Sequence, residues 1–254
     1  MDNAILAEIK KKREFSQLPE KDIELAYSQF EKRQATEEEK IKLTKELLRK
    51  LFSVFVSKKL LVLKNKEPEW ILRKHISTRE RLPYYEKLYK RILGNWEKAS
   101  IIDLGAGING FSYSFFKKIR INVNYIGVES VGQLVDLTNL HFKTKKLNGK
   151  SIHLSLFEKE KVLNIIKKEK KPKIVFMFKV IDALEDLKRD YSKELLLEIA
   201  PLVDKVVVSF ATKSLGNRRS FKAKRSWILE FIKENFNILD NFEVGGERYI
   251  VFGK

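Results

Sequence analysis

The chain has 254 residues, 43% of them hydrophobic, which is enough to bury a core as one large domain or as a catalytic domain with a smaller appendage. It contains no cysteine, which excludes a disulfide framework, a thiolate nucleophile and a cysteine-ligated zinc or iron–sulfur site. The 52 Lys and Arg residues against 34 Asp and Glu give a formal net charge of +18, which favours a polyanionic partner such as nucleic acid.

Residues 1–8 are charged within the first turns, and no stretch of the chain reaches the roughly 18 apolar residues that a membrane span needs. We therefore expect a cytoplasmic protein that does not associate with membranes. The absence of cysteine, the two Met residues and the frequent Lys, Glu and Ile are also typical of an archaeal or thermophilic source.

Residues 4–74 carry a helical pattern, in which Leu43, Leu47 and Leu51 recur at helical spacing between Lys- and Glu-rich faces. A basic run near the start contains Lys10, Lys11, Lys12 and Arg13. Such a run can be a solvated face, or it can grip RNA phosphates beside a catalytic domain, and the pattern leaves both interpretations open. We predict a helical subdomain that docks on RNA or the ribosome over residues 1–74, and a catalytic domain over residues 75–254.

After residue 92, short apolar runs alternate with amphipathic stretches, a pattern typical of a parallel sheet covered by helices on both faces. The predicted strands are residues 100–104, 125–129, 174–178, 205–210 and 248–252. The predicted helices are residues 111–119, 131–143, 158–170, 191–199 and 226–235. Residues 236–252 are typical of an antiparallel hairpin that turns at Gly245 and Gly246. The expected fold class is α/β, Rossmann-like, with a mostly parallel seven-stranded sheet, an antiparallel last hairpin and an all-helical N-terminal subdomain.

A glycine-rich turn follows the first predicted strand, where residues 101–110 read IIDLGAGING. Gly105 and Gly107 allow a ligand to approach the main chain closely. The next strand ends at Glu129, roughly 20 residues later, where such folds bind ribose hydroxyls. The third glycine of a dinucleotide site and the G-x-x-x-x-G-K-[ST] loop of an ATP site are both missing. Each signal alone is weak, since an acidic strand end is often a surface group, but their order resembles class I S-adenosylmethionine-dependent methyltransferases.

Further blocks extend this likeness. Residues 75–82 read HISTRERL, residues 103–109 read DLGAGIN and are followed by the strand end at Glu129, residues 178–185 read FKVIDALE, and residues 208–216 read VSFATKSLG. With these blocks the chain resembles the aminoglycoside-resistance family that methylates guanine N7 in the decoding region of 16S rRNA. The resemblance implies an S-adenosylmethionine-dependent RNA methyltransferase that acts on helix 44 of the 30S subunit, as a monomer and without a metal.

The resemblance also implies a set of cofactor-binding residues. Arg81 would pair with the methionine carboxylate, whereas Asp103 can orient the glycine loop or the amino group of the cofactor. An acidic residue follows the third strand in the family and receives the adenine amino group. Leu156 occupies that place here, so adenine recognition would fall to the backbone or to Ser155. The expected set is His75, Ser77, Arg81, Asp103, Gly105, Ala106, Gly107, Asn109, Glu129, Ser130, Ser155, Leu156 and Phe178.

Guanine N7 carries an in-plane lone pair, so its attack on a sulfonium methyl needs positioning rather than a general base. Flipped bases are usually held by aromatic faces and polar groups. We expect Phe178, Lys179 and Phe210 to position the base, although aromatic residues on buried strands more often pack in the core. The three histidines, His75, His141 and His153, are expected to be structural. A basic loop is expected either to bind RNA or to be merely solvated, and it contains Lys213, Arg218, Arg219, Lys222 and Lys224.

Two other functions stay open at this point. The chain could methylate another rRNA or tRNA site, with N1 of adenine or a ribose hydroxyl as the acceptor in place of guanine N7, or it could be a non-catalytic RNA-binding or ribosome-assembly protein that keeps the fold. Leu156 is the best argument for a degenerate site. The retained polar and glycine positions argue for activity, and these are Arg81, Asp103, Gly105, Gly107 and Glu129.

Overall fold

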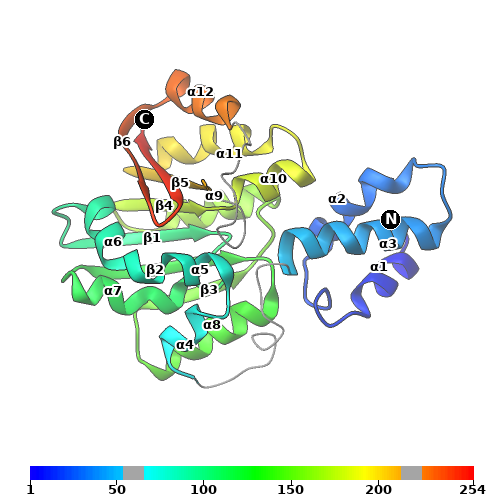
Figure 1. The fold of residues 1–254 in the computed structure, drawn as a ribbon, viewed down its shortest axis with the longest axis horizontal. Coiled ribbons are helices and arrows are strands. Elements are labelled where there is room, and N and C mark those ends of the chain that lie inside the picture. Colours follow the sequence, from blue (N-terminus) through cyan, green and yellow to red (C-terminus); the bar gives the residue numbers. More distant parts are fainter. Residues whose placement is uncertain (54–65, 213–224) are drawn as a thin grey trace.

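A computed structural model of the chain describes residues 1–53, 66–212 and 225–254. Figure 1 shows two groups of elements, with helices α1 to α3 gathered at one end and a helix-covered sheet forming the rest. The sheet has seven strands in the order β3-β2-β1-β4-β5-β7-β6. Its last hairpin is antiparallel, so the expected fold class is confirmed.

The five strands from β3 to β5 run parallel, and their carboxyl ends therefore lie along one edge of the sheet. The strand order reverses between β1 and β4, and in open α/β sheets this switch point is where ligands bind. The strands are β1 Lys98–Leu104, β2 Asn122–Glu129, β3 Gly149–His153, β4 Lys173–Phe178, β5 Lys205–Ala211, β6 Asn237–Val244 and β7 Glu247–Gly253.

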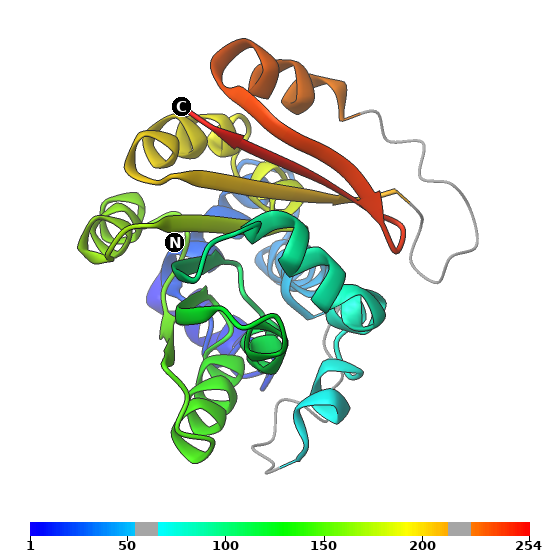
Figure 2. The same cartoon turned by 90° about the vertical axis from the view of Figure 1, so that its left-hand side faces the viewer.

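Helices cover both faces of the sheet, as Figure 2 shows from a second direction. Neighbouring strand residues point to opposite faces, so Ile101 packs into one core and Ile102 into the other. The first core contains Tyr85 and Tyr89 of α6, and the second contains Val162 of α9. The helices of this part are α4 Pro68–Leu72, α5 Ile76–Arg81, α6 Tyr85–Leu93, α7 Tyr113–Lys118, α8 Gly132–Thr144, α9 Lys159–Lys168, α10 Ile181–Leu187, α11 Tyr191–Ile199 and α12 Ser226–Asn235.

The N-terminal helices are α1 Asn3–Lys10, α2 Glu20–Glu31 and α3 Glu37–Leu48, and α3 continues into a π-helical turn, η1 Arg49–Ser53. Side chains cap two of them, since Asp2 accepts a hydrogen bond from the Ala4 N–H and Thr36 accepts one from the Glu39 N–H. These helices then bury their own apolar faces, including Ile9 and Ile23, both fully buried.

The N-terminal helices are attached to the sheet part by a few polar contacts. Gln29 of α2 donates a hydrogen bond to the main-chain oxygen of Asp186, at 2.5 Å. Lys50 of η1 pairs with the Asp186 carboxylate at 2.7 Å. Asp186 lies in α10, which follows β4, so both contacts bring the N-terminal helices to the carboxyl edge of the sheet.

The predicted elements exist, with some shifted bounds. The helix predicted over residues 111–119 begins as a 3-10 turn, η4 Asn109–Ser112, before α7 starts at Tyr113. Four elements, β3, α5, α6 and α10, were not among the strands and helices predicted from apolar patterning. Strand β3 has only five residues with little burial, and α10 has seven, so neither produces a long periodic signal.

Candidate cofactor and active site

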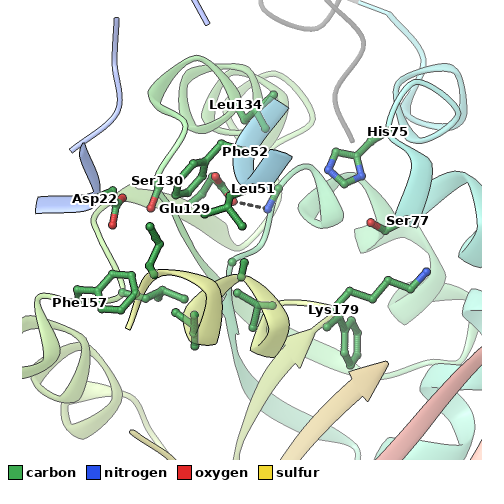
Figure 3. A pocket seen from close by; sticks show the side chains of 18 residues that line it. Asp22, Leu51, Phe52, His75, Ser77, Glu129, Ser130, Leu134, Phe157 and Lys179 are labelled. Atoms are coloured by element: carbon green, nitrogen blue, oxygen red, sulfur yellow. Dashed lines mark hydrogen bonds between the residues drawn. The ribbon is translucent and has the colours of Figure 1, made fainter. Parts of the chain in front are cut away.

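A pocket of about 120 Å³ lies where β1, β2 and β4 end. Asp22 and Ser130 lie at one end of it, Glu129 near the middle, and Ser77 and Lys179 at the other end (Figure 3). Small-molecule sites usually exceed roughly 300 Å³, so the walls must separate when a nucleoside cofactor enters. The remaining lining residues are Leu51, Phe52, His75, Gly105, Gly107, Leu134, Leu156, Phe157, Phe178, Val180, Ala183, Leu184 and Leu187.

The glycine turn after β1 requires its glycines. Gly105 and Gly107 have φ angles of 71° and 52°, a region that residues with a Cβ rarely adopt. A Cβ at Gly105 would also lie 2.6 Å from Cγ2 of Val180. The N–H groups of Gly105 and Ala106 donate to the Val128 carbonyl at 2.9 and 3.1 Å, so the turn is fastened to β2. The main chain at Gly105 and Gly107 is therefore left open to the pocket.

Glu129, at the end of β2, supports the same turn and faces the pocket. Its Oε2 accepts a hydrogen bond from the Gly107 N–H at 2.7 Å, and its Oε1 accepts one from the Val131 N–H at 2.8 Å. Burial raises the pKa of Glu129, and these backbone hydrogen bonds oppose the shift. A carboxylate oxygen has two lone pairs, so each oxygen can accept one more donor. This donor set fits the two hydroxyls of a ribose.

Asp103 stands behind the turn rather than in the pocket. Its Oδ2 accepts hydrogen bonds from Asn109 Nδ2 at 2.7 Å and from the Tyr125 hydroxyl at 2.5 Å. The side chain is buried, and burial raises the pKa of Asp103 to about 6. Asp103 was expected to orient either the glycine loop or the amino group of the cofactor. Its contacts in this structure are with groups that support the loop.

Arg81 is fully enclosed, and its carboxylate partner is a residue of the protein. Its Nη2 donates to both oxygens of Glu247, at 2.9 and 3.2 Å, and its Nε donates to the Tyr249 hydroxyl at 3.1 Å. Nη1 donates to Asn109 Oδ1 at 3.3 Å, and the guanidinium lies 4.7 Å from the centre of the Phe178 ring. Arg81 and Asn109 therefore lie behind the pocket wall, and Phe178 forms part of that wall.

Lys179 follows β4 with a left-handed backbone, φ 57°, which is uncommon outside glycine. Its N–H donates to the carbonyl and to the hydroxyl of Ser209, both at 3.1 Å, and these bonds hold the conformation. Its Nζ lies 2.8 Å from Glu80 and 3.4 Å from Glu247. The ammonium group is thus held at the mouth of the pocket beside two carboxylates, and such backbone strain often occurs at functional positions.

The histidines have different surroundings. His75 lines the pocket, and burial together with the nearby charges of Arg81 and Lys179 lowers its pKa to about 3. It is therefore a neutral imidazole at physiological pH. His141 stacks on Phe111 with ring centres 4.3 Å apart, away from the pocket. The His153 Nε2 lies 3.0 Å from the Ser130 carbonyl oxygen.

Six of the expected cofactor-binding or base-positioning residues do not line the pocket, namely Arg81, Asp103, Ala106, Asn109, Ser155 and Phe210. Ser155 is fully buried, and its hydroxyl donates to Asp22 Oδ1 at 2.6 Å and accepts from the Phe157 N–H at 3.1 Å. Phe210 is buried in the core that contains α11 and α12, with the Arg225 guanidinium 5.3 Å from its ring centre. Neither side chain faces the pocket in this structure.

The basic run at the end of α1 lies on the surface and does not line the pocket. Lys10 pairs with Glu20 at 3.4 Å and Lys11 with Glu8 at 2.6 Å. The Lys11 side chain is 74% exposed, so its pairing is weak in water and can be exchanged for phosphate. The expected basic loop, with Lys213, Arg218, Arg219, Lys222 and Lys224, lies outside the described residues.

Among the pocket residues that the patterns of the sequence did not reveal, Asp22, Leu51 and Phe52 come from the N-terminal helices. Asp22 looks like an ordinary acidic residue in the first turn of an amphipathic helix. Only the way that α2 and η1 pack against the sheet brings these side chains to the pocket, so no local signal was available.

Over residues 1–53, 66–212 and 225–254, no helix has both the length and the apolar character that crossing a bilayer demands. The same residues contain no group of three or more His, Asp or Glu side chains placed to hold a metal ion.

This sheet order, with a glycine turn after β1 and an acidic residue at the end of β2, defines a class I S-adenosylmethionine-dependent methyltransferase. The sequence profile of the ribosomal RNA methyltransferase (FmrO) family matches residues 66–238, and the chain belongs to this family. It is therefore an enzyme, and its cofactor is S-adenosylmethionine.

Solved structures agree with this fold. The 16S rRNA methyltransferase RmtF, in complex with S-adenosyl-L-homocysteine, is 20% identical over 100% of both chains, with a TM-score of 0.79. An rRNA methylase from Escherichia coli is 17% identical over 99% of both chains, with a TM-score of 0.76. The 16S rRNA methylase RmtB is 17% identical over 99% of this chain and 98% of its own, with a TM-score of 0.75. Comparison with curated protein sequences gives no match.

Proposed function

We propose that the protein transfers a methyl group from S-adenosylmethionine to guanine N7 in helix 44, the decoding region of 16S rRNA in the 30S subunit, as in aminoglycoside resistance. The similar structures of RmtF and RmtB, whose described substrate is 16S rRNA, support the choice of RNA. Their similarity extends over the whole chain, including the N-terminal helices that family members would use for docking.

The choice of acceptor atom rests on the ion pairing and protonation of the ionisable groups beside Lys179. Glu80 and Glu247 are both paired with cations, and His75 is neutral with a pKa of about 3. A ribose hydroxyl acceptor would need a base to remove its proton. Guanine N7 has no proton to lose, so methyl transfer to this atom does not need any of these groups to act as a base.

In this proposal the chain holds the cofactor and orients the base. When bound, S-adenosylmethionine supplies an electrophilic methyl group on a sulfonium. Glu129 accepts the ribose hydroxyls, the main chain at Gly105 and Gly107 approaches the cofactor, and Ser77 and His75 line its methionine end. The Phe178 ring and the Lys179 ammonium position the guanine and exclude water.

Four expected residues have less direct roles in the proposal. Asp103 and Asn109 support the glycine turn from behind. Arg81 is held by Glu247 and would meet the methionine carboxylate only by exchanging that partner. Phe210 lies in β5 with its side chain in the core, so a role at the target base would require that side chain to leave the core.

The proposal assigns RNA docking to a subdomain over residues 1–74, through the basic run Lys10, Lys11, Lys12 and Arg13, and methyl transfer to residues 75–254. The loop cations Lys213, Arg218, Arg219, Lys222 and Lys224 are proposed to bind phosphates near the target base. The enzyme is proposed to act in the cytoplasm as a monomer.

Transfer of labelled methyl groups from S-adenosylmethionine to 30S subunits, free 16S rRNA and bulk tRNA tests this function, with the modified base identified by mass. We expect 7-methylguanosine in 30S subunits. Label in tRNA, or on another atom of rRNA, would replace the proposed substrate. Cofactor binding without label in any RNA would contradict the proposed acceptors, and absence of both would support the non-catalytic alternative.

A further inference from the structure

Asp22 reaches the pocket from the N-terminal helix α2. Its side chain is 1% exposed, and its Oδ1 accepts a hydrogen bond from the Ser155 hydroxyl at 2.6 Å. Its other oxygen, Oδ2, is buried and accepts no hydrogen bond of normal geometry, although the nearby Ser130 hydroxyl lowers the pKa of Asp22. A buried carboxylate oxygen without a donor is unfavourable by about 1–3 kcal/mol or more, and most such groups in proteins are satisfied. The pocket therefore offers one strong, unused acceptor.

The place of this acceptor along the pocket indicates which part of the cofactor it meets. Glu129 suits the ribose, and Lys179 and Ser77 lie on one side of it (Figure 3). Asp22 lies on the opposite side, next to Ser130, as the same view shows. The base of the nucleoside extends from the ribose on the side away from the methionine. Asp22 is thus at the adenine end.

The walls at this end suit a flat base, because Phe52, Leu134, Leu156 and Phe157 are all apolar. The side chain of Leu156, which follows β3, cannot accept a hydrogen bond from the adenine 6-amino group, and its main-chain oxygen already accepts one from the Tyr191 hydroxyl at 2.7 Å. Ser155 cannot replace it, because its hydroxyl is occupied by Asp22 and by the Phe157 N–H. Among the described side chains at this end, Asp22 and Ser130 can accept a hydrogen bond from the amino group, and Asp22 is the one that carries a charge.

We propose that Asp22 accepts the hydrogen bond from the adenine 6-amino group of S-adenosylmethionine, so that helix α2 completes the adenine subsite. This inference rests on the proposed assignment of the pocket to the cofactor. Burial raises the pKa of Asp22 to about 6, and the Ser155 and Ser130 hydroxyls oppose the shift, so the group is an anionic acceptor above neutral pH.

The contacts of α2 explain how a residue so far away in the chain can serve the pocket. Ser155 holds Asp22 on one side, and Gln29, two turns further along α2, binds the main-chain oxygen of Asp186 on the other. The helix is therefore fixed to both walls of the adenine end. It follows that the N-terminal helices contribute to cofactor binding as well as to the proposed RNA docking.

The test compares ligands with and without the 6-amino group. Isothermal titration calorimetry would measure binding of S-adenosylhomocysteine and S-inosylhomocysteine, whose 6-oxo group accepts where the amino group donates. The proteins are the wild type, Asp22→Asn, Asp22→Ser and, as a matched control on an exposed position of α2, Glu24→Gln. Thermal unfolding checks that each variant folds.

We expect the wild type and Glu24→Gln to prefer the adenosyl ligand by about tenfold or more, the range for a hydrogen bond to a charged group. Asp22→Ser should abolish the preference, and Asp22→Asn should abolish or reverse it, because an amide can donate to the 6-oxo group. An unchanged preference in either folded Asp22 variant, or no preference in the wild type, would overturn the inference. If the wild type bound neither ligand, the cofactor pocket itself would be wrong.

Discussion

Arg81 and Glu247, 166 residues apart in the chain, form a buried two-pronged ion pair whose side chains are 2% and 3% exposed. The pair connects the segment before the sheet to the start of β7. The charge of Arg81 lowers the pKa of Glu247 against the effect of burial, so Glu247 is a carboxylate at neutral pH. Lys179 and Ser209 contact the same carboxylate, which therefore organises the region behind Phe178.

Breaking this pair should destabilise the fold strongly. Glu247→Gln leaves the Arg81 charge buried without its counterion, and such changes cost about 3–5 kcal/mol. Urea unfolding would measure the difference. The control is Asp240→Asn, which breaks the exposed pair with Arg91 and should have a much smaller effect. Equal effects of the two changes would contradict a dominant role for burial.

Glu129→Gln should weaken cofactor binding about 10- to 100-fold, because hydrogen bonds to a charged group contribute about 1.5–3 kcal/mol. Gln also loses one acceptor oxygen, so either the Gly107 N–H or the Val131 N–H loses its partner, together with one ribose hydroxyl. Calorimetry with S-adenosylhomocysteine measures the loss, and Asp136→Asn at an exposed position of α8 is the control. Wild-type affinity in Glu129→Gln would remove Glu129 from the ribose site.

Lys179→Gly removes the ammonium group of this residue and keeps its left-handed backbone conformation. Glycine tolerates the φ of 57°, so we expect the stability to change by no more than about 1 kcal/mol. Loss of the ammonium group should reduce methylation of 30S subunits about tenfold or more while the cofactor still binds. Lys146→Gly is the matched control, since Lys146 is exposed and has a φ of 49°. Normal methylation by Lys179→Gly would exclude a role for the ammonium group.

The stability of the protein should depend on the protonation of Asp22. The pKa of Asp22 is about 6 in the folded protein and 3.8 in the unfolded chain, so the folded state holds the proton more strongly. The stability that comes from this tighter proton binding is fully present below pH 3.8 and is lost as the pH rises through 6. Glu158 increases the shift, and His153 opposes it.

Asp22→Asn should consequently be more stable than the wild type at pH 7.5, with a free energy of unfolding higher by up to about 3 kcal/mol and a higher unfolding temperature. The difference should vanish near pH 4. Calorimetric unfolding of the ligand-free proteins at both pH values checks this. A wild type that is the more stable at pH 7.5 would show that the carboxylate is not strained by burial.

Changing Lys10, Lys11, Lys12 and Arg13 to Glu should abolish methylation of 30S subunits and leave cofactor affinity unchanged. Charge reversal replaces attraction to phosphates by repulsion. The control reverses four exposed cations at the opposite edge of the sheet, Lys167, Lys168, Lys170 and Lys171, which lie just before β4. Methylation that survives the first change, or is lost equally in both variants, would contradict docking through the basic run.

The sequence alone determined the sheet elements other than β3 and much of the pocket. Gly105, Gly107 and Glu129 could be assigned because each acts within a local unit of strand, turn and helix, where the backbone itself positions the ligand. The composition pointed to nucleic acid because charge accumulates over the whole surface irrespective of the fold. The family could be recognised because its motifs are short continuous stretches.

Only the tertiary structure decided which distant residues meet. Asp22 contacts Ser155 across 133 residues of chain, and Glu247 meets Arg81 across 166. Neither contact has a periodicity or spacing that a sequence pattern can carry, because each depends on how one element packs against another. The resemblance left the adenine to the backbone or to Ser155, whereas packing commits the Ser155 hydroxyl to Asp22. Long-range packing thus decides which of the available polar groups is left for the ligand.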